Sequence, residues 1–336
     1  MRVSIVIPTF NRSLLLPRTI PALANQQTSP DLEYEVIFVS NGSTDNSGTI
    51  LQDALSQNPE KFRYFYSPPT GGPSAPRNIG IRAATGDVII ILDDDVLPDP
   101  ELLLRHAEFH KEHPEPHHAA LGEAYVPLHL LHDPMSLFHS FPYEQVRRLD
   151  RLSYLHFWTC NVSVKRQFML AHGMFDERFL YYEDMICAHR LASQGMHLHF
   201  LPSARGQHLH QLQASAVPAK GRWVGRWLYP FVEQIPEREV KERFGILSVD
   251  IGIRLLVKRL LKRAAFRLVD NPVTLACLKM AGATKSRRSR ITDLYYFLIF
   301  RRNLLAGYYQ AKREARAGHP LIANAPRSEC AEKCDG

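Results

Sequence analysis

The sequence contains little cysteine and no long hydrophobic run. Its five cysteines are odd in number and scattered along 336 residues, so we expect no disulfide framework and a reducing compartment. Cys330 and Cys334 lie in a polar tail without a partner pair at zinc-ligand spacing, and we expect no role for them. Because no stretch reaches about 18 uncharged apolar residues, a membrane-spanning helix is not expected. The beginning, MRVSIVIPTF, also lacks the pattern of a signal peptide.

Acidic residues are scarce in one part of the chain. Residues 251–316 hold 16 Lys and Arg residues but only three acidic ones, Asp270, Asp293 and Glu314. This segment carries a net charge of +13, and because the whole chain carries +7, the remainder carries −6. The hydrophobic content of 45% and charged content of 22% are those of a globular protein. The sequence therefore predicts a mildly acidic body and a basic C-terminal segment with a separate role.

Apolar runs that alternate with helical patterns indicate the fold class. Strands are expected at Ser4–Pro8, Tyr34–Val39, Phe62–Tyr66 and Val88–Leu92. Helices are expected from Leu14 to about Asn25, from Thr44 or Asp45 to about Gln57, and from Ala75 to Ala84. Pro17 and Pro21 are expected to be able to interrupt the first of these helices. The strands are continuously apolar, which is typical of a mostly parallel sheet covered by helices on both faces. The predicted fold class is therefore α/β.

Polar residues follow three of these strands. They lie at Pro8–Arg12, Ser40–Asp45 and Asp93–Asp95, and in a parallel sheet such strand ends converge in one ligand-binding crevice. The run VIIILDDDVLPDP, from Val88 to Pro100, places three adjacent carboxylates directly after a buried strand. Adjacent anions repel each other, and a hard divalent cation such as Mg²⁺ or Mn²⁺ would offset that repulsion. A solvated turn with helix-capping acids is the alternative interpretation.

The loop before the third expected helix is rich in glycine and proline. Its sequence is GGPSAPRNIG, from Gly71 to Gly80, and it includes Arg77. Glycines let a backbone approach a ligand closely, and a helix N-terminus favours anions. A divalent ion with few protein ligands implies a phosphate partner, which this loop is suited to bind. An ordinary loop with a surface arginine explains the same residues equally well.

Seven motifs, in order and spacing, resemble those of family 2 glycosyltransferases with the GT-A fold. The first four are VSIVIPTFNR, SNGSTD, APRNIG and ILDDDVLPDP. The other three are Asn161, GMFDERF (Gly173–Phe179) and YYEDMICAHRLASQG (Tyr181–Gly195). The resemblance extends from about Arg2 to Tyr229. It implies a GT-A-type, mostly parallel sheet flanked by helices, and an inverting transfer of a sugar from a nucleotide diphosphate donor.

The resemblance also implies which residues bind the donor. The residues that match the family's nucleobase pocket are Pro8, Thr9 and Phe10. Asn41 stands where the family often has an aspartate that recognises the base. Because an asparagine can still accept a hydrogen bond from a uracil N–H, a UDP-sugar is favoured. Arg77 falls near the donor phosphates.

The resemblance implies a divalent cation as cofactor, Mg²⁺ or Mn²⁺. Asp93 and Asp95 match the metal-binding D-x-D motif, and one intervening residue points both side chains the same way on an extended backbone. Asp94 points elsewhere and is expected to contact a sugar or to hold the loop. His208 and His210 follow an expected strand at residues 197–201, where a family histidine can complete the metal shell. His208 is favoured by register, and chance placement among 16 histidines stays open.

Asp184 matches the general base of the family. Such a carboxylate removes the proton of the acceptor hydroxyl as that hydroxyl attacks the anomeric carbon. The alternative is that Glu183 and Asp184 are only an acidic pair favoured by the dipole at a helix N-terminus.

Processive members of the family carry a Q-x-x-R-W motif. In this sequence Arg222 and Trp223 are present, but Ala219 stands where the glutamine belongs. We therefore expect transfer of one or a few sugars per encounter rather than synthesis of a polymer.

Three regions are expected along the chain. Residues 1–235 form a GT-A-like catalytic domain, with the nucleotide-sugar site in its N-terminal half and the acceptor side in its C-terminal half. Residues 236–318 form a basic helical extension, and 319–336 a flexible tail. Within the extension, 251–269 has the pattern of a basic amphipathic helix, and Leu294–Phe300 is a second apolar stretch.

The basic extension has two open interpretations. One is docking on an anionic membrane surface, which suits a lipid-linked acceptor, and the other is a helical cap packed on the catalytic body. No base-recognition motif accompanies the charge, so nucleic acid binding is not expected. The expected location is cytoplasmic, with peripheral contact at the cytoplasmic face of a membrane left open.

The sequence favours a metal-dependent, inverting, non-processive glycosyltransferase that acts on a glycan or lipid-linked glycan acceptor. A nucleotidyltransferase is an alternative, because it shares the α/β sheet, the nucleotide crevice and an aspartate-held metal. A catalytically inactive, membrane-associated scaffold is a second alternative. It is disfavoured because Asp93, Asp95 and Asp184 are all present.

Overall fold

The chain divides into two compact units. The computed structural model describes residues 1–138, 140–209, 212–244, 246, 271–283 and 288–319. The first unit comprises residues 1–130 and 139–211, and the second comprises residues 131–138 and 212–336. This division differs from the expected boundary at residue 235, because it groups helix α8 (Val217–Gln234) with the C-terminal elements.

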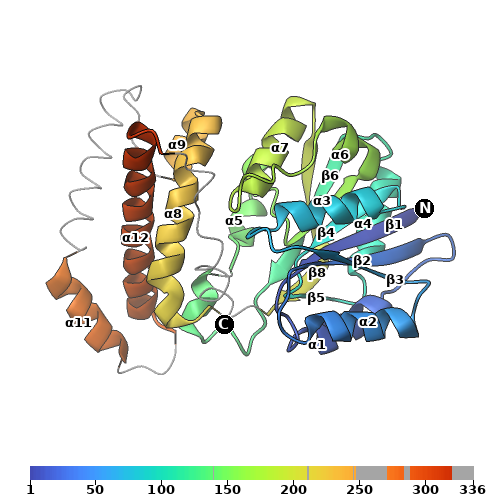
Figure 1. Ribbon diagram of the computed structural model, residues 1–336, viewed down its shortest axis with the longest axis horizontal. Coiled ribbons are helices and arrows are strands. Elements are labelled where there is room, and N and C mark those ends of the chain that lie inside the picture. Colours follow the sequence, from blue (N-terminus) through green and yellow to red (C-terminus); the bar gives the residue numbers. More distant parts are fainter. Residues whose placement is uncertain (139, 210–211, 245, 247–270, 284–287, 320–336) are drawn as a thin grey trace. The chain divides into compact units, whose positions relative to one another are not determined.

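The first unit is built around one eight-stranded sheet (Figure 1). Its strands are β1 (Arg2–Thr9), β2 (Glu33–Asn41), β3 (Phe62–Ser67), β4 (Val88–Leu92), β5 (Val96–Pro98), β6 (His118–Tyr125), β7 (Asn161–Lys165) and β8 (His197–His208). Their order in the sheet is β3-β2-β1-β4-β7-β6-β8-β5. The first four in this order are parallel, and so are β6 and β8. Strand β7 is antiparallel to both its neighbours, and β5 is antiparallel to β8. The predicted α/β class with a mostly parallel sheet is confirmed.

Helices follow most of the strands of this unit. They are α1 (Leu16–Ala24), α2 (Ser47–Gln57), α3 (Ser74–Ala83), α4 (Leu102–Glu112), α5 (Tyr143–Val146), α6 (Arg166–His172) and α7 (Glu183–Ser193). A short 3₁₀ helix, η2, spans Tyr154–His156. Pro17 and Pro21 do not interrupt α1. Pro17 lies in the first turn, where a missing N–H leaves no hydrogen bond unmade.

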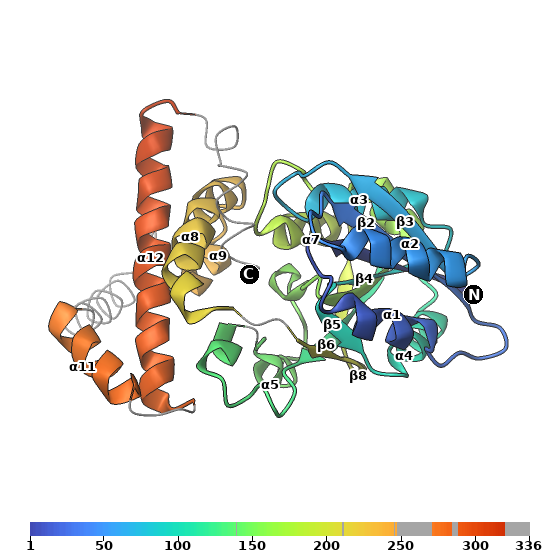
Figure 2. The same ribbon diagram turned by 60° about the horizontal axis from the view of Figure 1, so that its bottom comes forward.

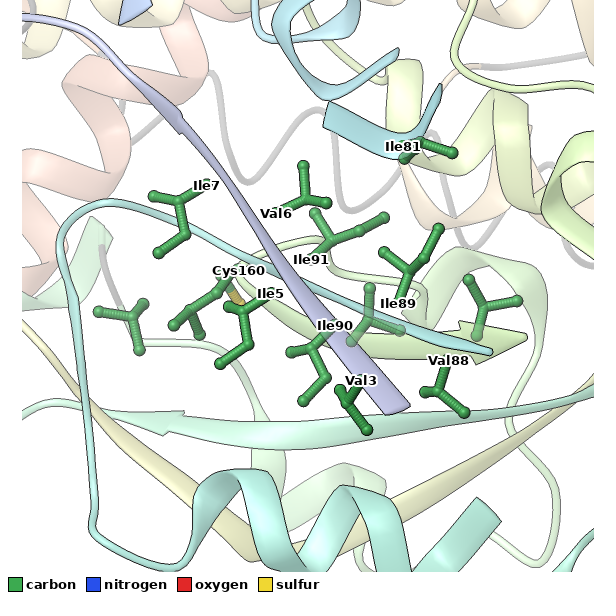
Figure 3. Close-up of a cluster of buried hydrophobic side chains, with 14 of the residues drawn as sticks. Val3, Ile5, Val6, Ile7, Ile81, Val88, Ile89, Ile90, Ile91 and Cys160 are labelled. Carbon is green, nitrogen blue, oxygen red and sulfur yellow. The ribbon is translucent and has the colours of Figure 1, made fainter. Parts of the chain in front are cut away.

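The central strands are apolar on both faces because both faces are covered. In Figure 3, Ile89 and Ile91 of β4 point toward Ile81 of α3, whereas Ile90 points to the opposite side of the sheet. Every residue of β4 is buried, and so is β1 from Val3 to Thr9. This burial explains why these strands read as continuous apolar runs, and it makes their ends rigid supports for polar side chains.

The second unit is helical (Figure 2). Its described elements are η1 (Pro134–Phe138), η3 (Ala214–Ala216), α8, α9 (Arg238–Arg243), α11 (Pro272–Ala283) and α12 (Arg290–Arg316). Helices α8 and α12 approach so closely that a Cβ added at Gly225 or Gly307 would collide with a backbone carbonyl of the other helix. Arg226 forms an ion pair with Glu314 over 2.8 Å. Glycines at the crossing therefore explain why α8 packs with α12.

The apolar stretch expected at Leu294–Phe300 lies inside α12. Leu298 is buried, and the ring of Phe300 lies 5.3 Å from that of Phe138 in η1, whereas Phe297 is half exposed. The amphipathic helix expected at 251–269 lies outside the described residues. Within the described part of the chain, no helix combines the length and apolarity needed to cross a membrane.

Candidate active site

The three consecutive aspartates stand where the central strand β4 ends. The chain turns at Asp93, whose carbonyl accepts a hydrogen bond from the N–H of Val96 over 3.1 Å. The short strand β5 then pairs with β8 in the register Val96 with His208. The strand pairing therefore brings His208, the last residue of β8, next to the aspartate turn. The sequence placed His208 after a strand at residues 197–201, but that strand extends to His208 itself.

Asp94 holds the loop that follows β1. Its Oδ2 accepts a hydrogen bond from the Phe10 N–H over 3.1 Å, and its Oδ1 accepts one from Arg12 Nε over 2.9 Å. Arg12 also lies 3.6 Å from Asp95 Oδ2. Both carboxylate oxygens of Asp94 are thus engaged by this loop. Of the two roles expected for Asp94, contact with a sugar and support of the loop, the structure favours support of the loop.

Arg77 lies buried between two carboxylates. Its guanidinium donates to Asp93 Oδ1 over 3.0 Å and to Glu183 Oε1 over 2.6 Å, and its side chain is 4% exposed. The ring of Phe175 lies 5.3 Å beneath it. Its Nε finds no hydrogen-bond partner among the described residues, and the contact with a donor phosphate expected from the sequence stays a prediction. In the structure its role is to join the aspartate turn to helix α7.

Glu183 and Asp184 form the first turn of α7. The residue before them, Tyr182, has a left-handed backbone (φ 64°) although it is a bulky residue. Such a conformation costs of the order of 1–3 kcal/mol and is found at functional sites. Asp184 Oδ1 accepts a hydrogen bond from the Met185 N–H over 2.7 Å. Burial, together with the charge of Glu183, raises the pKa of Asp184 to about 7.

Asp95 and His208 face each other across the turn. His208 Nε2 lies 3.5 Å from Asp95 Oδ1, and both side chains are about nine-tenths buried. Metal–oxygen and metal–nitrogen bonds are each about 2.1 Å long. Two ligand atoms on one cation therefore lie at a similar distance from each other. The pair is therefore arranged as two ligands of one ion would be.

Negative charge exceeds positive charge in this site. The charged groups are the carboxylates of Asp93, Asp94, Asp95, Glu183 and Asp184 and the guanidinium groups of Arg12 and Arg77. Burial, and after it the charge of Asp95, raises the pKa of Asp94 to about 7. A divalent cation would relieve this excess. Asp93, with a side chain 31% exposed, is accessible for it, so the residues present fit such an ion.

The residues expected to bind the nucleobase lie at or next to the ends of the paired strands β1 and β2. Pro8 and Thr9 are buried at the end of β1, and the Thr9 hydroxyl finds no hydrogen-bond partner among the described residues. Asn41, at the end of the neighbouring strand β2, donates to the Gly72 carbonyl over 3.1 Å and accepts from the Thr70 N–H over 3.0 Å. Its amide thus fixes the 70–72 loop, and recognition of a base by Asn41 stays a prediction.

Two residues of the site were not assigned a role from the sequence. Arg12 lies in the quoted N-terminal motif, and only its position next to the β1 strand end could have suggested a partner for the aspartates. Glu183 was considered only as half of a helix-terminal pair. Its contact with Arg77 joins residues 106 positions apart in the sequence. A contact between segments so far apart cannot be predicted from a local sequence pattern.

Comparison with known proteins identifies the family. Residues 4–165 match the model of the family described as glycosyl transferase family 2. The chain contains a family 2 glycosyltransferase domain. Its matched region begins in β1 and ends with β7, and so includes the aspartate turn and Arg77.

Curated proteins that resemble this chain are moderately similar to it. One is validoxylamine A glucosyltransferase of Streptomyces hygroscopicus subsp. limoneus, 30% identical over 225 residues, or 57% of this chain and 48% of that protein. Another is poly(ribitol-phosphate) beta-glucosyltransferase of Bacillus spizizenii, 38% identical over 112 residues, or 33% of this chain and 18% of that protein. The chain thus spans about half the length, or less, of these relatives.

Solved structures show the same fold at low sequence identity. The mannosyltransferase PcManGT of Pyrobaculum calidifontis, in complex with GDP-Man and Mn²⁺, matches with a TM-score of 0.59 and 17% identity, covering 92% of this chain and 86% of that one. The S. aureus protein TarS in complex with UDP matches with a TM-score of 0.54 and 18% identity, covering 95% and 92%. These similarities support the GT-A-type architecture predicted from the sequence.

Proposed function

We propose that this chain transfers a sugar from a nucleotide diphosphate donor to a hydroxyl of a glycan or lipid-linked glycan, with inversion at the anomeric carbon. The observation that carries the proposal is the connection of the aspartate turn to Asp184 through Arg77 and Glu183. This connection supports a proposed cation site near a proposed basic carboxylate. Sugar transfer needs both, one at the leaving diphosphate and one at the attacking hydroxyl.

Asp184 is proposed as the general base. In inverting transfer the hydroxyl attacks from the face opposite the leaving diphosphate, so the base and the cation act on opposite sides of one carbon. A carboxyl with a pKa of about 7 is well matched to accept that proton near neutral pH. Its hydrogen bond from the Met185 N–H engages Oδ1, and Oδ2 is then the oxygen proposed to take the proton.

Asp93, Asp95 and His208 are proposed as ligands of a divalent cation. When bound, the ion would stabilise the negative charge that builds on the departing diphosphate. A mixed set of carboxylate and imidazole ligands suits Mn²⁺ at least as well as Mg²⁺. The fold neighbour PcManGT was solved with Mn²⁺, which supports this choice.

A UDP-sugar is the favoured donor. Support comes from TarS, a fold neighbour solved with UDP and with UDP-GlcNAc. PcManGT was solved with GDP-Man, so both bases belong in the test. In this chain Pro8, Thr9 and Phe10 are proposed to line the base, and the buried Thr9 hydroxyl is an available polar group for it.

Aromatic rings beside the cation site are proposed to face the acceptor. Phe141 stacks on Trp158 with ring centroids 4.7 Å apart, and lies 6.1 Å from the ring of His208. Aromatic faces are suitable surfaces for the apolar faces of sugar rings. Ala219, in place of the glutamine of Q-x-x-R-W, supports non-processive transfer.

Peripheral membrane contact is proposed for the basic segment. The net charge of +13 over residues 251–316 would attract an anionic surface, at about 1 kcal/mol per Lys or Arg near it. The full chain should co-sediment with vesicles containing anionic lipid at low salt and dissociate at high salt, whereas neutral vesicles should not bind it. Equal recovery with both vesicle types would contradict this part of the proposal.

Product analysis separates sugar transfer from its alternatives. The full chain is incubated with Mn²⁺ and a panel of UDP- and GDP-sugars, and separately with nucleoside triphosphates and sugar 1-phosphates. Release of a nucleoside diphosphate from a nucleotide sugar, lost in Asp95→Asn and kept in Asp53→Asn, supports the proposal. Release of pyrophosphate from a triphosphate would instead identify a nucleotidyltransferase. An absence of nucleotide binding with Mn²⁺ would favour an inactive scaffold.

A further inference from the structure

A group of histidines lies at the other end of the sheet. His118 opens β6 and His197 opens β8, and these residues are partners in the parallel register of the two strands. His117 precedes β6, and its carbonyl accepts a hydrogen bond from the His197 N–H over 2.9 Å. Each of the three imidazoles offers a nitrogen, and these nitrogens lie within 4.8 Å of one another. Backbone pairing thus holds three metal-binding side chains together.

The strand register places this cluster away from Asp93. Ala119 of β6 pairs with Val164 of β7, and Val164 pairs with Ile89 near the start of β4. Asp93 follows the end of β4, several residues further along at about 3.3 Å per residue. The separation is therefore about 13 Å or more along the strands alone, and the sheet adds the width of two strand spacings, which is too far for a single ion to be shared.

We propose that His117, His118 and His197 form a binding site for a transition-metal dication, with Zn²⁺ as the preferred ion. Imidazole nitrogen is a favoured ligand for zinc, nickel and copper and a poor one for magnesium. Three protein ligands suffice for a tetrahedral zinc whose fourth position is filled from outside. The site is independent of the proposed sugar transfer.

Small side-chain movements would complete the geometry. With zinc–nitrogen bonds of about 2.0–2.1 Å, two ligands on one tetrahedral zinc lie about 3.4 Å apart, closer than the 4.8 Å limit in this structure. His197 is exposed and His117 is half-buried, so both rings can rotate toward an ion. His118 is the more fixed of the three, with a side chain 14% exposed.

A hydrogen bond leaves one nitrogen of His118 available to a metal. Its Nδ1 lies 2.8 Å from Nε2 of His199, and we assign the proton to Nδ1, so that Nε2 keeps its lone pair. Metal-bound histidines commonly donate their other ring N–H in this way, which fixes the tautomer and the ring orientation. His199 is itself held by His113, whose ring lies 4.9 Å away and stacks on Phe109.

Glu115 supplies a candidate fourth ligand. Its Oε2 lies 3.5 Å from His118 Nε2, close to the separation of two ligands on one zinc. The side chain is 54% exposed, so the carboxylate can adjust to an ion or leave the position to water. This carboxylate would also reduce the charge of the bound dication.

Zinc uptake tests the proposal. The full chain, free of a histidine tag and stripped with a chelator, is titrated with Zn²⁺ against a chromophoric competitor. Asp93→Asn/Asp95→Asn is used as the background so that the aspartate turn does not contribute. We expect one zinc per chain in this background, and a rise in the unfolding temperature on zinc addition.

Two variants and a matched control make the result specific. His117→Ala/His197→Ala should lose the zinc, and His199→Phe should weaken binding by about 10- to 100-fold because it removes the acceptor behind His118. His129→Ala/His132→Ala removes two exposed histidines elsewhere and should bind zinc as tightly as the background. Circular dichroism without zinc checks that each variant is folded. Failure of the background chain to bind zinc, or unchanged binding in His117→Ala/His197→Ala, would overturn the proposal.

Discussion

Arg77 donates a hydrogen bond to Glu183 over 2.6 Å, across 106 residues of sequence. The same guanidinium binds Asp93. One buried side chain therefore sets the positions of Asp93 and of helix α7. This helix begins with Glu183 and Asp184. Because buried charges without partners are costly, this arginine and its two carboxylates depend on each other.

Replacing Arg77 by lysine should impair catalysis more than donor binding. A lysine keeps the charge, but its single ammonium cannot reproduce two divergent guanidinium bonds. We expect Arg77→Lys to lower kcat about tenfold or more while KM for the donor changes little, because Asp184 loses its support. Steady-state kinetics checks this, with Arg82→Lys, an exposed arginine on the same helix, as the control. Equal kcat in both variants would show that Arg77 does not position the site.

Asp184 should control the pH dependence of transfer. Its raised pKa, about 7, means that burial disfavours the charged form, so the basic carboxylate is populated as the pH rises through 7. The rate constant kcat should therefore fall tenfold per pH unit below that value. Asp184→Asn should lower kcat about 100-fold or more and abolish this acidic limb. As the control, Asp53→Asn changes an exposed residue of α2. It should leave kcat and its pH dependence unchanged. Near-normal turnover in Asp184→Asn would refute the assignment.

Glu35 should stabilise the first unit in its charged form. Burial alone would raise its pKa, but hydrogen bonds from Thr85, Arg63 and Ser4 outweigh burial and lower the pKa to about 2. Because the folded pKa lies below the unfolded value, the stabilisation is complete above pH 4.5 and is lost as the pH falls toward 2.

Substitution of Glu35 measures that contribution. Glu35→Gln should lower the free energy of unfolding by about 2–3 kcal/mol at pH 7, and the difference from the parent should shrink as the pH falls below 4.5. Urea unfolding at several pH values provides the measurement. Glu33→Gln, on the same strand but exposed, should change stability by less than about 0.5 kcal/mol. A pH-independent difference would contradict the cause assigned here.

Gly307 should be essential to the packing of α12 on α8. A Cβ at this position collides with the Arg222 carbonyl, so Gly307→Ala should destabilise the second unit by about 1–3 kcal/mol despite the better helix propensity of alanine. Gly48→Ala, in α2, is the matched control, because its Cβ meets only the Tyr64 hydroxyl at 3.4 Å. That control should be neutral or slightly stabilising when both are compared by thermal unfolding.

The sequence predicted the elements that depend on local patterns. Strands β1 to β4 were located to within two residues of their ends, because buried parallel strands are continuous apolar runs. The aspartate turn was recognisable because three carboxylates directly follow such a run. His208 was placed near this turn, and the pairing of β5 with β8 brings it there.

Contacts between distant segments were not predictable from local patterns. The bond from Arg77 to Glu183 and the bonds from Arg12 and Phe10 to Asp94 depend on how loops fold over strand ends. The catalytic domain was expected to extend to residue 235, so it included the residues of α8. The packing of α8 on α12 depends on the fit of Gly225 and Gly307 to facing carbonyls, which no local pattern reveals.

Titration calorimetry of nucleoside diphosphates tests the central claim, that the aspartates after β4 hold a cation shared with a diphosphate. UDP and GDP are titrated into the full chain with Mn²⁺ and with a chelator, and then into Asp95→Asn and Asp53→Asn. We expect that one nucleotide binds with Mn²⁺ and that its binding is at least about tenfold weaker in the chelator or in Asp95→Asn. The Asp53→Asn variant should behave as the parent. Binding that is indifferent to Mn²⁺ and to Asp95, or no binding of either nucleotide, would contradict it.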